Sequence, residues 1–400
     1  MILAVVVPAL IGISLRIEIT CPDSWVFQMH TIRTSCSLLI LLIVADTLWA
    51  GRRYMVHSIG DLPTERIWIS PSAINDLGQI VGQRHTDTGF RGILWDAGIV
   101  VDLGDLPGEN AGCSPVNINN YGQIVGVGFT EFGYRPIHWA SGSFTDLATL
   151  SARESGAALG INAFGAVVGN TYDSDSRLSY PFSWSASAGF HRFVEPRPVE
   201  NTLAIAINDS GLIAGYKSTA GVVEAVIWQG ASTTVVNAPP GMSRFLPLAM
   251  NNSGFVVGGS LNNNASELAT LWKSSEALSL GDLPGGVVFS RAFSINDLGE
   301  VVGSSADEEV TAFSETKAFY WNEGVMRDLN EMIDRQSGWV LYNALDINNR
   351  GEIVGMGMAP NGRGGGFLLT PVPEPSSLTL LALFAGGIAI RLFRSRARIL

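Results

Sequence analysis

Acidic side chains are the first residues of this 400-residue chain that could do chemistry. Asp173 with Asp175, and the run Asp307, Glu308 and Glu309, are spaced as carboxylate pairs that could cleave a glycosidic bond if they faced one cavity. The run could also offer oxygens to calcium, although no Asp-x-Asp-x-Asp-Gly loop occurs. We expect acidic loop tips, no metal site and no cofactor, with calcium as the alternative.

Histidine and serine add little to this picture. His85, His138 and His191 show no His-x-His or His-Glu-x-x-His spacing that would offer a metal pair, so we expect solvated surface histidines. No Gly-x-Ser-x-Gly nucleophile motif occurs. We therefore assign no catalytic residue and expect a protein that is not an enzyme. A hydrolase or lyase acting on extracellular polysaccharide remains the alternative.

The elements that must position any site follow a repeated pattern, apolar-Asn-x-x-Gly-x-apolar-apolar-Gly, which occurs seven times. Its asparagines are Asn75, Asn119, Asn162, Asn208, Asn251, Asn296 and Asn348. The asparagine can close an Asx-type turn and the first glycine accepts positive φ, so each copy predicts a hairpin. Because these residues repeat, we interpret them as folding residues. Three copies place Asp after the asparagine, which we also assign to the turn.

Two more strands follow each hairpin, the first of them usually ending in tryptophan, as at Trp95 and Trp321. Four short strands in about 44 residues are typical of a propeller blade. The seventh copy stops near Thr370 without its fourth strand, and a segment at 57–63 resembles that missing strand. The sequence thus predicts an all-β fold over residues 55–370, a seven-bladed β-propeller closed by an N-terminal strand.

Both chain ends predict export. Residues 29–50 have the features of a signal peptide, with Arg33 before an apolar core and small residues at the cleavage position. Residues 1–28 are either a mis-called start or an extra apolar leader. At the other end, Pro373, Glu374 and Pro375 precede an apolar segment at about 378–393. Arginines follow it at Arg391, Arg394, Arg396 and Arg398.

Residues 371–400 resemble a PEP-CTERM sorting signal. The resemblance implies a chain that is exported, held briefly in the inner membrane by a C-terminal transmembrane helix, and processed by an exosortase-type enzyme near Pro373 to Pro375. It would then reach the cell surface or the extracellular space. An anchor that is never cut and a buried core helix are the alternatives. Residues 376–393, which are 18 in number, would span about 27 Å as a helix, and this length is marginal for a permanent membrane anchor.

The repeats themselves resemble the HAF family of bacterial extracellular repeats, through the Asn hairpin and through Lys317-Ala318-Phe319-Tyr320-Trp321. Other copies depart from the second element. The resemblance implies a surface protein and carries no settled chemistry. The net charge of −11 argues against nucleic acid as a partner. Cys21 and Cys36 fall in the leader, which leaves Cys113 without an intramolecular disulfide partner. We expect a surface or matrix protein that binds exopolysaccharide or another surface protein.

Overall fold

In the residues that it describes, the computed structural model is all-β, as the sequence predicts for residues 55–370. It describes residues 3–6, 16–19, 52–60, 67–87, 89–104, 106, 112–131, 133–147, 154–193, 201–262, 266–284, 289–306 and 316–373. Apart from two 3-10 turns, at Leu329–Glu331 and Arg335–Ser337, every regular element in these ranges is a β-strand.

The chain divides into two compact units, Met1–Arg52 and Arg53–Leu400. In the first, strands β1 (Leu3–Val6) and β2 (Arg16–Ile19) pair as an antiparallel hairpin. The proposed signal peptide at 29–50 lies outside the described residues.

The second unit is built from seven antiparallel modules of four strands. Modules 1 to 3 comprise β4 (Trp68–Ile74), β5 (Ile80–Thr86), β6 (Gly89–Asp96) and β7 (Ile99–Asp102); β8 (Gly112–Ile118), β9 (Ile124–Thr130), β10 (Gly133–Ala140) and β11 (Ser143–Asp146); and β12 (Glu154–Ile161), β13 (Val167–Asp173), β14 (Leu178–Ser185) and β15 (Gly189–Arg192). Modules 4 and 5 comprise β16 (Asn201–Ile207), β17 (Ile213–Thr219), β18 (Val222–Gln229) and β19 (Ser232–Val236); and β20 (Arg244–Met250), β21 (Val256–Leu261), β22 (Glu267–Lys273) and β23 (Glu276–Gly281). Modules 6 and 7 comprise β24 (Phe289–Ile295), β25 (Val301–Ala306), β26 (Thr316–Asn322) and β27 (Val325–Asp328); and β28 (Val340–Ile347), β29 (Ile353–Met358), β30 (Gly364–Pro371) and β3 (Tyr54–Ser58).

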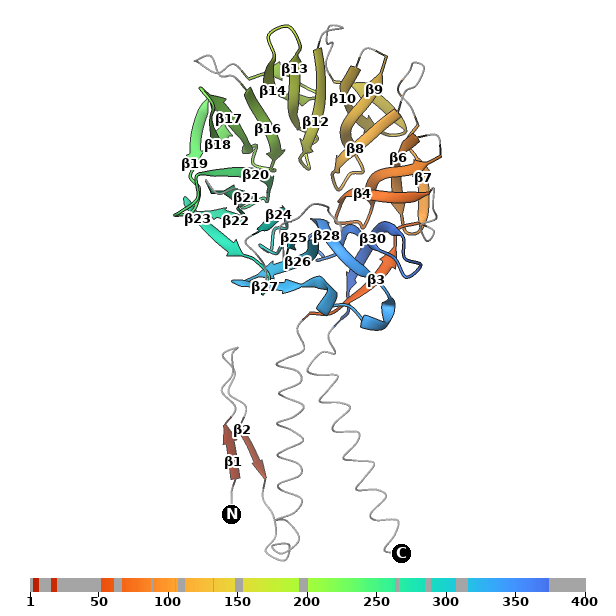
Figure 1. Cartoon of the computed structure of the whole chain (residues 1–400), viewed down its shortest axis with the longest axis vertical. Coiled ribbons are helices and arrows are strands. Elements are labelled where there is room, and N and C mark those ends of the chain that lie inside the picture. The colour runs from red at the N-terminus through yellow and green to blue at the C-terminus, as the bar shows by residue number, and fades with distance from the viewer. Residues whose placement is uncertain are drawn as a thin grey trace, which may run out of the picture. The chain divides into compact units, whose positions relative to one another are not determined.

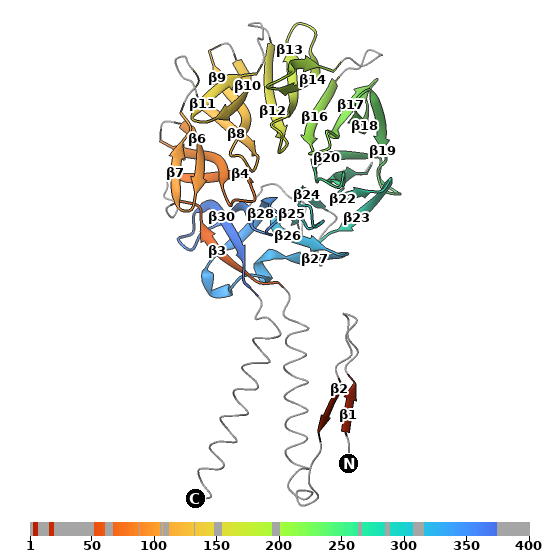
Figure 2. The ribbon, with the colours of Figure 1, turned by 180° about the vertical axis from the view of Figure 1, so that it is seen from behind.

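The modules stand side by side around one axis, with the first strand of each nearest the centre (Figure 1). The view from behind shows the same ring (Figure 2). Twisted four-stranded sheets packed radially in this way are the architecture of a β-propeller.

The last module joins both ends of this unit. Strand β3 pairs antiparallel with β30, from Tyr54 opposite Pro371 to Ser58 opposite Phe367. The predicted bounds of this strand, 57–63, are wrong, because the strand ends at Ser58 and Gly60 adopts φ +77°. A left-handed glycine ends an extended strand.

The repeated apolar pair at the start of each second strand fills the interior. Ile80 and Val81 are both fully buried, and they point to opposite faces of their sheet. Ile80 packs with Ile59 and Leu368, whereas Val81 packs with Cys113 of module 2. A strand buried on both faces carries consecutive apolar residues. The described buried residues thus group into clusters between neighbouring modules, and the thiol of Cys113 is buried in the one between modules 1 and 2.

The second glycine of each repeat has a packing reason that the sequence did not reveal. A Cβ atom added at Gly82, Gly126 or Gly215 would collide with a backbone carbonyl of the innermost strand, at Ser70, Ser114 or Leu203. That strand carries a register shift at the same level in every module. The bulged inner strand thus comes too close to the second strand for any side chain there.

The C-terminal sorting residues fall at the edge of the described chain. Pro373 is described, whereas Glu374, Pro375, the segment at about 378–393 and the four arginines after it lie outside the described residues. Within the ranges that the structure covers, no helix has the length and apolar character to cross a membrane.

Candidate functional site

The repeated asparagine closes the turn in each module, as predicted. The Oδ1 atom of Asn75 accepts from the backbone N–H of Leu77 at 3.0 Å and of Gln79 at 2.9 Å. Gly78 follows with φ +83°. The backbone N–H of residues two and four positions after the other six asparagines bonds in the same way.

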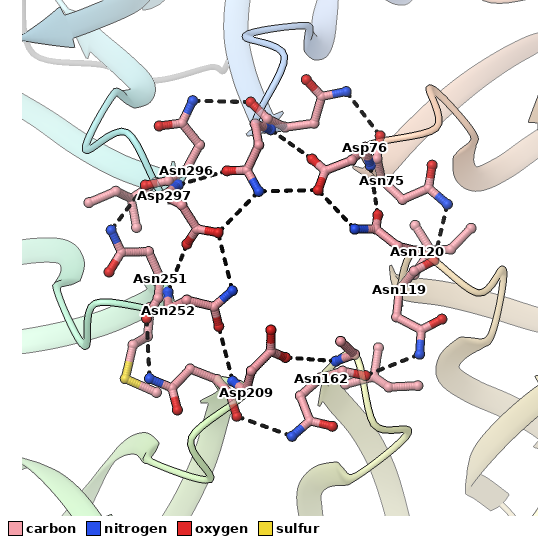
Figure 3. A pocket seen from close by; sticks show the side chains of 18 of the residues that line it. Asn75, Asp76, Asn119, Asn120, Asn162, Asp209, Asn251, Asn252, Asn296 and Asp297 are labelled. Atoms are coloured by element: carbon pink, nitrogen blue, oxygen red, sulfur yellow. Dashed lines mark hydrogen bonds between the residues drawn. The ribbon is translucent and has the colours of Figure 1, made fainter.

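The amide nitrogen of the same asparagine does something that the turn alone does not require. The Nδ2 atom of Asn75 donates to the backbone carbonyl of Asn119 in the next module, at 3.0 Å. Equivalent bonds of 2.9 to 3.3 Å run from each module to its neighbour, and Asn348 donates to Asn75 to complete the circle. Seven buried side chains thus close a ring of hydrogen bonds around the axis (Figure 3).

A second circle lies at the residues that follow these asparagines. Its members are Asp76, Asn120, Ala163, Asp209, Asn252, Asp297 and Asn349. No aspartate neighbours another aspartate in this order, and each carboxylate accepts from the backbone N–H of an adjacent module. We call both circles together the collar. Amide side chains that lie between the aspartates donate hydrogen bonds to two of them. The three negative charges can therefore lie together around the mouth of one pocket.

One amide links two of the carboxylates. The Nδ2 atom of Asn349 lies 3.1 Å from Oδ2 of Asp76 and 3.1 Å from Oδ2 of Asp297. Two carboxylates therefore converge at the mouth, the arrangement that could support glycosidic cleavage. They were assigned to turns from the sequence, because the repeat does not show that residues 221 positions apart meet.

The collar surrounds a polar pocket of about 190 Å³. Beneath it, the first residue of each repeat forms an apolar ring, and beyond that ring lies a channel cavity of about 380 Å³. The ring residues are Ile74, Ile118, Ile161, Ile207, Met250, Ile295 and Ile347. The pocket and the cavity share six of these residues as a common boundary.

Asp346 lines the channel cavity and was missed by the sequence analysis. Its carboxylate accepts from Ser294 Oγ at 2.6 Å and from the backbone N–H of Ile74 at 2.8 Å and of Ile347 at 2.9 Å, so it joins module 7 to modules 6 and 1. Burial raises the pKa of its carboxyl to about 6, against the lowering effect of these hydrogen bonds. The signal was available, because the same position holds Ala73, Asn117, Gly160, Ala206, Ala249 and Ser294 in the other repeats.

The rim of the collar exposes apolar side chains at the hairpin tips. Tyr121 and Phe164, in neighbouring modules, are each 79% exposed, and Leu77 and Leu298 occupy the equivalent position in modules 1 and 6. These exposed aromatic rings offer flat apolar faces beside the polar pocket. The collar face therefore combines hydrogen-bonding groups with flat apolar surfaces.

The acidic residues singled out from the sequence lie elsewhere. Asp173 and Asp175 belong to the β13–β14 hairpin, where Asp173 accepts from Ser176 Oγ and from the backbone N–H of Asp175. Those hydrogen bonds lower the pKa of Asp173. Asp173 and Asp175 thus lie at a loop tip, as predicted. The run at 307–309 lies outside the described residues.

The prediction of solvated histidines is wrong for His138 and right for His191. His138 is 7% exposed in strand β10, where it packs against Trp184 of the next module, and burial lowers its pKa. His85 is stacked on Trp68 at a ring separation of 4.3 Å. His191 is exposed. Among the residues that the structure describes, no three acidic, histidine or cysteine side chains form a group that could hold a metal ion.

No protein-family model matches the chain, and no curated protein matches it. Solved structures that align with it include streptogramin B lyase, at 10% identity and a TM-score of 0.47 over 80% of this chain and 98% of that one. Virginiamycin B lyase from Staphylococcus aureus aligns at 8% identity and a TM-score of 0.47, over 80% and 100%. A variant of AofleA from Arthrobotrys oligospora aligns at 11% identity and a TM-score of 0.39, over 70% and 90%. Similarity at this level carries no information on function.

Proposed function

We propose that this chain is an exported seven-bladed β-propeller that binds extracellular polysaccharide through its collar face, without catalysing a reaction. In this proposal residues 29–50 direct export, and residues 371–400 hold the chain in the inner membrane until an exosortase-type enzyme processes it near Pro373 to Pro375. A surface protein is the alternative partner. The observation that carries the proposal is the collar, a rigid ring of amides and carboxylates with exposed aromatic residues at its rim.

The collar suits a hydroxyl-rich polymer for two reasons. Its outer circle presents both donors and acceptors, and sugar hydroxyls can serve as either. Its rim offers the faces of Tyr121 and Phe164, on which the C–H face of a sugar ring can lie. Because the side chains are already fixed by their mutual hydrogen bonds, binding costs little ordering entropy. Binding of a polymer without reaction requires no catalytic group in addition to these side chains.

The test is the binding of the mature protein to the extracellular polysaccharide of its own producing organism, by isothermal titration calorimetry with and without calcium. We expect binding that weakens about tenfold in a Tyr121→Ala, Phe164→Ala double variant. Val222→Ala, an exposed apolar residue away from the collar, is the matched control. Equal binding by the double variant and the control would rule out the collar face.

One observation favours the second candidate function, a polysaccharide hydrolase or lyase: the convergence of Asp76 and Asp297 on Asn349. An acid and base pair needs one carboxyl that holds a proton, whereas both groups here accept hydrogen bonds from N–H donors. We therefore place binding first. Shortening of the polymer by the wild type, lost in both Asp76→Asn and Asp297→Asn, would reverse the order.

A further inference from the structure

The end of the ring away from the collar carries a groove that differs from the collar in every chemical respect. It encloses about 430 Å³ between modules 2 and 3, with Leu203 of module 4 in its lining. On strand β12 the groove is lined from Ser155 to Leu159, whereas the collar pocket is lined by Ile161 at the end of that strand. The two sites share no lining residue.

The groove is walled by aromatic and aliphatic side chains. Phe129, Tyr134 and Tyr172 line it together with Val127 and Leu203. Tyr134 is 56% exposed and Tyr172 is 42% exposed, although both are large rings that could have been buried. An incompletely covered aromatic wall is what a ligand with a flat apolar face requires.

An aromatic strip extends the groove toward module 1. From Tyr134 the rings follow at centroid separations of 5.4 Å to Phe129, 5.3 Å to Phe90 and 6.2 Å to His85. His85 then stacks on Trp68. The first two contacts are edge-to-face, which fixes the orientation of each ring. A line of fixed rings leading out of a pocket suits an elongated ligand.

The groove carries no charge among its lining residues, and its polar groups include the hydroxyls of Ser114, Ser155 and Ser179, with Asn170 and Thr171 also in the lining. Of the charged residues that adjoin the lining in sequence, Glu154 pairs with Arg192 and Arg135 lies 3.9 Å from Asp146, whereas Asp173 accepts hydrogen bonds within its own hairpin. An ionised ligand would lose its hydration without gaining a partner. The lining therefore favours an uncharged ligand that offers hydroxyl groups as well as an apolar face.

We propose that this groove is a second binding site, for a neutral sugar residue, with the aromatic strip receiving the adjoining sugars of a glycan. The C–H face of the sugar would lie on Tyr134 or Tyr172, and its hydroxyls would bond the serine hydroxyls. The proposal concerns a site distinct from the collar, so either one can fail without the other.

Methyl glycosides of neutral hexoses, neutral deoxyhexoses and glucuronic acid are the probes, titrated by calorimetry into the mature protein. We expect at least one neutral glycoside to bind and methyl glucuronide not to bind. The Tyr134→Ala variant should bind about tenfold more weakly, and Ser155→Trp, which fills the groove, should abolish binding. Leu278→Ala, an exposed apolar residue of module 5 that lines neither site, is the matched control and should leave this binding unchanged.

The outcomes separate the two sites. Loss of methyl glycoside binding in Tyr134→Ala and Ser155→Trp, with polysaccharide binding at the collar still sensitive to Tyr121→Ala, supports both proposals. Absence of binding by every neutral glycoside, or binding that Ser155→Trp does not reduce, overturns the groove site. Binding of a fatty acid or a long-chain alcohol in place of sugars would also overturn it. A thermal melt of each variant establishes that a loss of binding is not a loss of folding.

Discussion

The two ends of the ring differ in how closely the modules repeat one another. At the collar end every module repeats the same turn, and the seven asparagines hydrogen-bond to one another around the axis. At the other end the modules differ, and an aromatic strip and an uncharged groove occur beside modules 1 to 3. The repeated turns thus close the ring at one end. At the other end, residues that differ between modules create a local surface. Four predictions test this division, from the largest effect to the smallest.

The largest effect is expected from the second glycine of a repeat. In Gly215→Ala the new methyl group meets the carbonyl of Leu203 and the ring of Trp228, so we expect a loss of about 4 kcal/mol or a failure to fold. Gly211→Ala in the same turn is the control, because it has open space and only its φ of +79° is strained, at a cost of about 1 kcal/mol. Urea unfolding measures both. Equal losses would mean that the close approach of the strands does not explain the glycine.

The collar asparagine has a turn role and a ring role that can be separated. Asn208→Ala removes the acceptor of two backbone N–H groups and the donor to Asn251, and should lower the free energy of unfolding by about 3 kcal/mol. Asn208→Asp keeps the turn acceptor but puts a buried carboxylate oxygen against the carbonyl of Asn251 in place of the donor, so we expect at least as large a loss at pH 7. Urea titrations of both variants decide the point. A wild-type stability for Asn208→Asp would show that the ring bond contributes nothing.

Asp346 should make stability depend on pH. Its pKa rises from 3.8 in the unfolded chain to about 6 in the fold, so the folded state binds the proton more tightly. The free energy of unfolding should therefore be greatest below pH 4 and fall as the pH rises through about 6, by about 2 kcal/mol. The wild type and Asp346→Asn, unfolded with urea between pH 4 and 7.5, provide the comparison. Identical pH slopes would exclude Asp346 as the source.

The smallest effect tests the one gap in the outer circle. Asn252 donates from Nδ2 to Oδ2 of Asp297 at 3.1 Å, and Ala163 occupies the matching position beside Asp209. Ala163→Asn should add that bond and stabilise the protein by only about 0.5 kcal/mol, because the half-buried position still faces the solvent of the open pocket. Ala163→Ser, too short to reach, is the control. Thermal melts that rank the serine variant as the more stable would contradict the assignment.

The sequence predicted those features that depend on neighbouring residues. The turn follows from the spacing of Asn75 and Gly78, because an Asx turn and a positive φ are local requirements. The all-β architecture follows from the repeat in the same way. The ring bond from Asn75 to Asn119 could not be predicted, since it depends on how far each module is rotated from the last.

The errors have local explanations too. The segment after Ser58 matches a repeated element that follows a strand, and we took it for the strand itself. His138 was judged by the lack of a metal-ligand spacing alone, although Ile137 and Trp139 flank it and its strand places it against a tryptophan of the next module. Asp346 was overlooked because we followed the residues that repeat, and this position carries an acidic residue in one repeat only. The groove combines residues of modules 2, 3 and 4 and has no signature in any one of them.

The pairing of β3 with β30 has a consequence for the order of events during folding. One partner is among the first residues of the ring to be made and the other is among the last, so some 300 residues separate them in the chain. Such a contact forms slowly, because the chain must first bring distant segments together. The seventh module can be completed only after all the strands of the ring have been made. The ring therefore stays open until synthesis has passed β30, and a chain that stops earlier cannot close it.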